Sequence, residues 1–123
     1  MMHIDQIRDY CLSKKATTES FPFDESTLVF KVMNKIFLMA PLDKWDKGEA
    51  SVTVKCDPDY TTELREQYES VYAGPYVSNK HWNTLALFKN ELPPKLVLQL
   101  IDHSYDMVVK GMTKKMRKEL EEL

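Results

Sequence analysis

Residues 27–56 read TLVFKVMNKIFLMAPLDKWDKGEASVTVKC, and this stretch decides the fold. Thr27–Val32 places its even-numbered apolar residues on one face, which predicts a strand with a buried side. Ile36–Ala40 is a second apolar run, and Asn34 between the two tolerates the positive φ that a tight hairpin turn needs. These two strands are expected to pair antiparallel. Ser51–Cys56 alternates in the same way and predicts a third strand.

The segments beside these strands carry the residue types of loops. Leu42–Ala50 is polar around Trp45, as expected of a long hairpin tip. Residues 16–26 are rich in turn-forming residues, and Phe21 and Phe23 are expected to anchor this ordered loop in the core.

Apolar residues at helical spacing predict the remaining elements. Asp57 is a favourable N-cap, and Pro58 suits the first helical position. A last strand is expected at Thr84–Phe88. The terminal helix carries its cations first and its glutamates last, which opposes the helix dipole, so this helix needs docking to be stable. The four expected helices cover residues 3–14, 57–69, 93–111 and 113–123.

Composition bounds the protein class. The chain has 123 residues, of which 43% are hydrophobic and 29% charged, as in an ordinary globular domain. Its formal net charge of -2 provides no global attraction to nucleic acid or membranes, so any such attraction has to be local. The sequence contains no apolar run of membrane-spanning length and no export signal. We therefore expect one domain over residues 1–123, located in the cytoplasm and without a membrane partner.

No pattern in the sequence predicts an enzyme. Cys11 and Cys56 both lie on apolar stripes, where burial as small hydrophobic residues is the expected role. His103 and Asp106 share a helix face, but two ligands are too few for a metal site. No phosphate-binding loop, zinc motif or nucleophile motif is present. We expect no catalytic residues, no metal and no cofactor.

Positive and aromatic residues gather in a segment without carboxylates. Residues 74–90 contain Lys80 and Lys89 and no Asp or Glu. Such a mixture of donors, cations and rings suits phosphate contact together with stacking. The outward residues Lys31 and Lys55, and Lys35 at the hairpin, extend this candidate patch. The alternative is that these lysines protect strand edges while Trp82 closes the end of the core. Within the segment the candidate residues are Tyr76, Asn79, Lys80, His81, Trp82 and Asn83.

These residues belong to a set of motifs that resembles the MmcQ/YjbR family of small bacterial proteins. The resemblance implies an α+β fold of the frataxin/CyaY-like kind, a two-layer sandwich with helices on one side of a mostly antiparallel sheet. It also implies double-wing binding of double-stranded DNA through hairpin loops. The sequence departs from the family pattern at Met33-Asn34 and at Asp24, where glycine is expected. The matching motifs are Asp9-Tyr10-Cys11-Leu12-Ser13, Phe21-Pro22-Phe23-Asp24, Val29-Phe30-Lys31-Val32, Leu42-Asp43-Lys44-Trp45, Lys55-Cys56-Asp57-Pro58, Leu64-Arg65 and Asn79-Lys80-His81-Trp82-Asn83-Thr84.

Two functions remain open at this point. The first is a non-enzymatic DNA-binding protein whose contacts are made by Lys31, Lys35, Lys55, Asn79, Lys80, His81 and Trp82. The second is a protein-interaction or small-ligand domain anchored by Tyr76 and Trp82, since these residue types dominate interface hot spots. Iron binding by an acidic first helix is not supported, because Arg8, Lys14 and Lys15 dilute its acidic residues.

Overall fold

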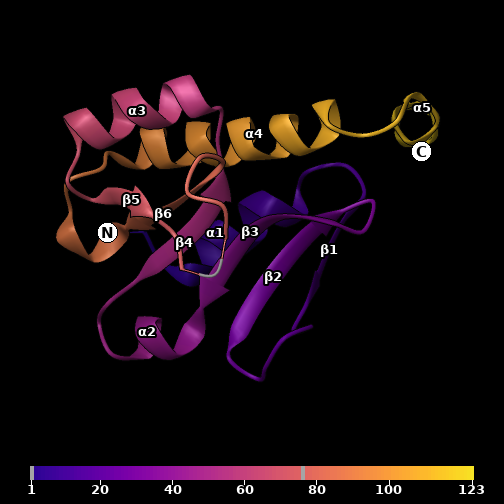
Figure 1. The fold of residues 1–123 in the computed structure, drawn as a ribbon. Helices are drawn as coiled ribbons and strands as arrows, with labels where there is room; N and C mark the ends of the chain where they lie inside the picture. Colours follow the sequence, from indigo (N-terminus) through magenta and orange to yellow (C-terminus); the bar gives the residue numbers. More distant parts are fainter. Residues whose placement is uncertain (1, 76) are drawn as a thin grey trace.

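The computed structural model describes residues 2–75 and 77–123 and confirms the α+β fold (Figure 1). Six strands form one sheet in the order β1-β2-β3-β4-β6-β5, and every neighbouring pair is antiparallel. The strands are β1 (Thr17–Ser20), β2 (Thr27–Val32), β3 (Lys35–Pro41), β4 (Ser51–Lys55), β5 (Val71–Ala73) and β6 (Trp82–Ala86). The helices are α1 (Ile4–Leu12), α2 (Leu42–Asp46), α3 (Pro58–Gln67), α4 (Pro94–Lys110) and α5 (Lys114–Glu121), with a 3-10 turn, η1 (Leu87–Lys89).

The central hairpin forms as the sequence predicts. Met33 and Asn34 adopt φ values of 50° and 66°, the left-handed pair that a two-residue turn between twisted strands requires. The register shifts between Phe30 and Lys31. Because of this irregularity, the consecutive residues Phe37 and Leu38 are both fully buried.

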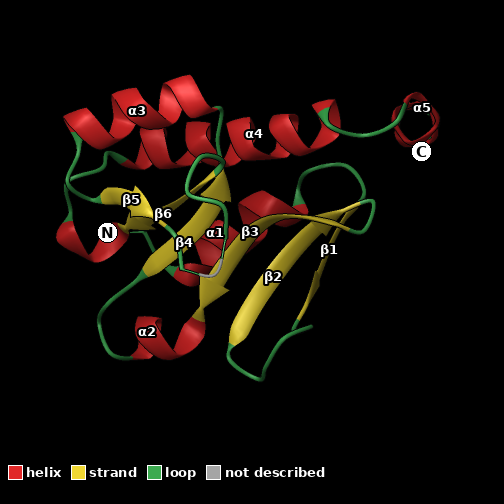
Figure 2. Cartoon of the chain, in the orientation of Figure 1, coloured by secondary structure: helices red, strands yellow, loops and turns green. Residues whose placement is uncertain are grey.

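One face of the sheet is covered by helices α1 and α4, and the core lies between the two layers (Figure 2). Ile7 and Cys11 of α1 enter this core, as do Leu100 and Ile101 of α4. Both cysteines are at most 1% exposed, which confirms their predicted burial. None of the helices within residues 2–75 and 77–123 is long and apolar enough to cross a membrane.

Helix α3 begins where Asp57 and Pro58 predict. The Asp57 carboxylate accepts the backbone N–H groups of Asp59 and Tyr60 at 3.1 and 3.3 Å. The Asp57 N–H donates to Nε2 of His103 on α4 at 3.0 Å, and the ring of Tyr60 meets the His103 ring edge-on. Helix α3 is therefore attached to α4 through its first turn.

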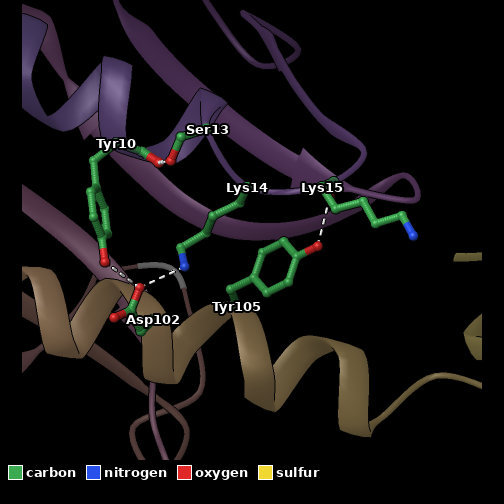
Figure 3. Close-up of polar contacts among 6 residues, drawn as sticks. All are labelled: Tyr10, Ser13, Lys14, Lys15, Asp102 and Tyr105. Atoms are coloured by element: carbon green, nitrogen blue, oxygen red, sulfur yellow. Dashed lines mark hydrogen bonds and ion pairs between the residues drawn. The ribbon is translucent and has the colours of Figure 1, made fainter. Parts of the chain in front are cut away.

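A second polar cluster attaches the N-terminal segment to α4 (Figure 3). The Tyr10 hydroxyl donates to Oδ1 of Asp102 at 2.6 Å, and Lys14 forms an ion pair with the same oxygen. The Lys14 ammonium also lies 5.1 Å from the centre of the Tyr105 ring, a cation–π contact. The Tyr105 hydroxyl donates to the Lys15 carbonyl oxygen at 2.6 Å.

The expected loop at 16–26 is partly wrong. Thr17–Ser20 forms the edge strand β1, and Phe21 and Phe23 are 49% and 64% exposed instead of anchored in the core. The loop turns around Asp24, whose carboxylate accepts the backbone N–H groups of Ser26 and Thr27 at 2.9 and 2.6 Å. These local bonds support the turn without apolar anchors.

Three further boundaries differ from the expectation. The predicted hairpin tip at Leu42–Ala50 begins with the short helix α2, whose Trp45 donates from Nε1 to the Ser51 carbonyl oxygen at 2.9 Å. The last strand is Trp82–Ala86 rather than Thr84–Phe88, because η1 follows it. Strand β5 was not predicted, since three residues are too few to show a period.

Candidate binding site on the open face of the sheet

The face of the sheet that α1 and α4 leave uncovered is called here the open face. Residues paired across antiparallel strands share a face, so the register identifies its members. One row runs from Val29 through Met39 and Thr53 to Thr84, with one residue from each of four strands. This row forms the middle of the open face.

Lys31 and Lys55 follow Val29 and Thr53 of this row by two residues, and therefore occupy the next position on the same face. Phe30, Leu38 and Val54 pair across β2, β3 and β4 on the core side, and Lys31 and Lys55 directly follow the outer two. Strands β2 and β4 run in the same direction, because each is antiparallel to β3. Lys31 and Lys55 therefore lie on the open face at the same end, roughly 10 Å apart, which is two strand spacings of about 4.8 Å.

The connection between β5 and β6 crosses the open face, as Figure 1 shows. Gly74 is buried there, and a Cβ atom at this position would lie 3.0 Å from Thr53 Cγ2 and 3.2 Å from Thr84 Oγ1. These approaches are too close for most side chains. The threonine hydroxyls hydrogen-bond to each other at 3.0 Å beneath the loop. The absence of a side chain at Gly74 thus seats the loop directly on the sheet.

Arg65 of α3 holds the far end of this loop. Its Nε donates to Oδ1 of Asn83 at 2.9 Å, and its Nη2 donates to the carbonyl oxygens of Asn79 and Trp82 at 2.7 and 3.3 Å. Nδ2 of Asn83 donates in turn to Thr61 Oγ1 at 3.0 Å. No carboxylate of the described residues pairs with the guanidinium, so carbonyl dipoles stabilise its charge.

A groove of about 800 Å³ lies on the open face between this loop and the loop at 21–26. Its floor contains Ile36, Met39 and Thr53, and the aromatic rings of Phe23 and Trp82 stand among its walls. This volume is within the range of roughly 300 to 1,000 Å³ typical of small-molecule sites. The remaining lining residues are Asp24, Ser26, Thr27, Pro41, Asp43, Lys44, Pro75, Val77 and Ser78.

Charge at the groove is mixed. Asp24 and Asp43 contribute carboxylates, and Lys44 contributes an ammonium. The hydrogen bonds that Asp24 accepts from Thr27 and Ser26 lower the pKa of its carboxyl group below the ordinary value, because they favour the ionised form. A negative charge is therefore fixed at the rim of the groove.

The structure brings together some of the predicted site residues and separates others. Trp82 pairs with Lys55 across β4 and β6 and shares the open face with Lys31. Asn79, Lys80 and His81 lie exposed in the crossing loop. The backbone carbonyl oxygens of Asn79 and His81 are occupied, by Arg65 and by the Cys56 N–H.

Lys35 lies apart from these residues. It pairs with Val32, which is fully buried on the core side, so Lys35 belongs to the face opposite Lys31. Tyr76 lies outside the described residues. Within residues 2–75 and 77–123, no ion pair is formed by any of the four predicted lysines, Lys31, Lys35, Lys55 and Lys80.

Sequence reasoning missed much of the groove. The sequence predicts Ile36 and Met39 only as part of an apolar strand, and it predicts Phe23 in the core. The alternation of β2 with β3 does point to Met39 on the outer face, but the register shift hides the position of Ile36. No sequence signal shows that Phe23 and Trp82 stand on the same groove, since this depends on the packing of two loops.

The two cysteines and His103 are engaged in the fold. Burial raises the pKa of the Cys11 thiol to about 12 and also raises that of Cys56, so both thiols are protonated near neutral pH. Nε2 of His103 already accepts the Asp57 N–H. Among residues 2–75 and 77–123, no three His, Cys, Asp or Glu side chains are arranged to hold a metal ion.

Comparison with known proteins identifies relatives of the whole chain. The chain is 28% identical over 122 residues to the uncharacterized protein YjbR of Escherichia coli K12, covering 99% of this chain and 100% of that protein. It is 29% identical over 99 residues to the uncharacterized protein YbdF of Escherichia coli O157:H7, covering 80% of this chain and 77% of that protein.

Solved structures and a family model agree with these relatives. The crystal structure of Deinococcus radiodurans protein DR2400, a DUF419 domain, aligns with a TM-score of 0.87 at 33% identity and covers 98% of this chain and 89% of that chain. A Pseudomonas syringae protein shares the fold, with a TM-score of 0.70 at 24% identity over 86% of this chain and 98% of that chain. Residues 12–107 match the family model described as YjbR, and the chain therefore belongs to the YjbR family.

Proposed function

We propose that this protein is a non-enzymatic, cytoplasmic nucleic-acid-binding protein that takes an unpaired base into the groove on the open face. The observation that carries the proposal is that Lys31, Lys55 and Trp82 share the open face, beside an apolar groove of about 800 Å³. The ring of Trp82 provides a stacking surface, and the two ammonium groups provide phosphate contacts. Base stacking on aromatic side chains is worth about 1–3 kcal/mol per base.

The charges at the groove support an arrangement in which the base lies inside the groove and the phosphate backbone lies outside it. Asp24 and Asp43 would repel a phosphate inside the groove, whereas an uncharged base meets Ile36 and Met39 on its floor. The phosphates then lie toward Lys31 and Lys55, with Lys80 on the crossing loop as a third contact. This arrangement favours a single strand over the double-stranded DNA implied by the family resemblance, because a paired base cannot leave the stack without cost.

Titration of single-stranded and duplex oligonucleotides tests this proposal. Trp45 is first replaced by Phe, so that fluorescence reports Trp82 alone. Three phosphate contacts on a single strand predict a slope of log affinity on log salt near -2, or about a twentyfold loss between 50 and 200 mM salt. Quenching of Trp82 by the single strand, with weaker binding of the duplex, is expected.

Two outcomes would contradict the proposal. One is the absence of any binding at about 10⁻⁴ M protein in low salt, the weak end of non-specific affinity. The other is duplex binding as strong as single-strand binding with no change at Trp82, which would place the nucleic acid on another surface.

A second function is favoured by the exposed aromatic residues of the loop at 21–26, of which Phe23 lines the groove. Phe21 and Phe23 are 49% and 64% exposed, and large exposed rings are typical of protein-binding surfaces. A protein or small-molecule partner that contacts Trp82 and Phe23 would remain bound at about 1 M salt, where charges are screened within about 3 Å. Such binding, lost in Trp82→Ala, would assign the groove to this class of partner.

A further inference from the structure

Charge is segregated along the molecule in a way that the groove does not explain. The outer side of α3, its N-cap and the turn that follows it are acidic, with Asp57, Asp59, Glu63, Glu66 and Glu69. Figure 1 shows α3 beside the N-terminal part of α4 and α5 beyond its C-terminal end. Seven of the 17 basic residues are carried by the segments at that second end, which is called here the basic end. They are Lys15, Lys35, Lys110, Lys114, Lys115, Arg117 and Lys118.

Contacts between distant segments assemble the basic end. Thr17 and Lys35 both pair with Val32, one from each neighbouring strand, so the turn before β1 lies beside the β2–β3 hairpin. Lys15 in that turn donates from Nζ to the Glu121 carbonyl oxygen of α5 at 3.1 Å. The two loops, α5 and the end of α4 therefore form one continuous surface.

Helix α5 is docked so that Lys114, Lys115 and Lys118 stay exposed, while Arg117 is half-buried. Leu120 is 7% exposed in the core, and Met116 packs against the same cluster. Lys114 and Lys118, one helical turn apart, point away from that side. The seven basic residues are partly offset by four acidic ones, which leaves three positive charges uncompensated. The described basic residues of this end form no ion pair with these carboxylates, which are Glu119, Glu121, Glu122 and, on α4, Asp106.

We infer that the basic end binds the phosphate backbone of a nucleic acid and extends the contact that begins in the groove. The inference rests on the proposed function for its choice of ligand. The β2–β3 hairpin joins the two surfaces, since it carries Lys31 on the open face and Lys35 on the other side. A strand whose base occupies the groove is thereby led past the hairpin to α5. Contacts with phosphates alone carry no sequence preference.

The docking of α5 favours a nucleic acid over an anionic membrane. A helix that lies in a membrane interface buries its apolar side in the lipid. In α5 this side, Met116 and Leu120, already packs on the protein core. The surface it presents is therefore charged, and it suits a ligand that is recognised by its phosphates.

The test compares two triple variants of equal charge. Lys114→Gln, Lys115→Gln and Lys118→Gln together remove charge from the basic end. Lys47→Gln, Lys89→Gln and Lys95→Gln remove the same charge from exposed positions elsewhere. Each is titrated by fluorescence anisotropy with single strands of about 30 and about 6 nucleotides, lengths above and within the usual site of roughly 4–16 nucleotides.

We expect the basic-end variant to bind the long strand about tenfold more weakly, with the salt slope reduced by about 2. Its binding of the short strand, followed by Trp82 quenching, should equal that of the unaltered protein. The control variant should bind both strands normally. An equal loss in both variants, or no loss in either, would overturn the inference, because the effect would then be one of net charge or absent.

Two results separate this inference from the proposed function. If the short strand leaves Trp82 unchanged while the long strand still depends on the lysines of α5, the groove proposal fails and the basic end stands. If phosphatidylserine-containing vesicles bind the protein through these lysines and the long strand does not, the basic end belongs to a membrane and the inference fails.

Discussion

The two faces of the sheet use alternate residues of the same strands in opposite ways. On the helix-covered face, Phe30, Phe37 and Leu38 have no exposed surface. On the open face Val29 is also fully buried, but Ile36, Met39 and Trp82 are only half-buried and lie beside a groove. The difference shows that one set of side chains supplies the stability of the sheet, which leaves the other set available for a ligand.

Polar groups follow the same division. On the helix-covered side, Lys14 is held by Asp102 and by the rings of Tyr10 and Tyr105 (Figure 3). Lys31 and Lys55 on the open face have no such ion pairs among the described residues. Cations with fixed partners stabilise the fold, whereas these two lysines can form contacts with a ligand at little cost to the protein.

The largest effect is expected from Phe37→Ala. Phe37 is fully buried and packs edge-on against Tyr105, with ring centres 5.4 Å apart. Truncation of such a ring lowers the free energy of unfolding by about 3–5 kcal/mol. Met39→Ala, two residues along on the open face, should cost less than half as much in urea unfolding. Equal losses would contradict the division between the faces.

The second largest effect is expected at alkaline pH, where the free energy of unfolding should fall because two groups on the helix-covered side lose their protons. The hydrogen bond to Asp102 raises the pKa of Tyr10 from 10 to about 12, and burial raises that of Cys11 from 9 to about 12. Both groups stay protonated longer in the folded protein than in the unfolded chain. Their contribution is fully present below pH 9 and is lost as the pH rises from 9 to 12.

Urea unfolding across this pH range measures the loss. Tyr10→Phe removes one of the groups whose pKa is raised by folding, so the stability of this variant should fall less steeply between pH 10 and 12. A slope identical to that of the unaltered protein would show that Tyr10 is not the group involved.

A smaller effect is expected at Arg65, which attaches α3 to the loop that crosses the open face. Arg65→Gln removes the donors to Asn79, Trp82 and Asn83, and hydrogen bonds to charged groups contribute about 1.5–3 kcal/mol. Because Arg65 is half-buried, we expect a loss near 2 kcal/mol and faster amide hydrogen exchange in residues 79–82. Arg65→Lys keeps the charge but not the planar fork, so it should rescue little of this protection.

The smallest effect on stability is expected from Trp82→Ala, together with the largest effect on ligand binding. Trp82 is only half-buried, and we expect a stability loss of about 1 kcal/mol. Loss of a stacked base should lower single-strand affinity about tenfold to a hundredfold. If Trp82→Ala cost more stability than Phe37→Ala, Trp82 would belong to the core. The alternative in which Trp82 closes the end of the core would then hold.

The fold could be predicted from the sequence where local signals are strong. The Met33–Asn34 turn, the cap at Asp57 and the strand β4 each depend on neighbouring residues, and the structure confirms all three. The predicted outward residues Ser51 and Thr53 of β4 are nevertheless buried, and Thr53 lies beneath the crossing loop at Gly74. The short strands β1 and β5 depend on pairing with distant strands, which no local period shows.

The site was less predictable because it depends on register and loop packing. Alternation correctly placed Lys31 and Lys55 on one face. The separation of Lys35 follows from its pairing with Val32 across the two-residue turn, and the exposure of Phe23 follows from the turn at Asp24. Neither could be read from residue type alone.

The two walls of the groove are anchored unequally. The Trp82 wall is tied to α3 by Arg65 and seated on the sheet at Gly74. The Phe23 wall is supported by the bonds that Ser26 and Thr27 donate to Asp24. The Leu42 N–H also donates to the Ser26 carbonyl oxygen at 2.8 Å. Ligands of different thickness would thus be accommodated by displacement of Phe23, while selectivity for shape would be set on the opposite side, at Trp82.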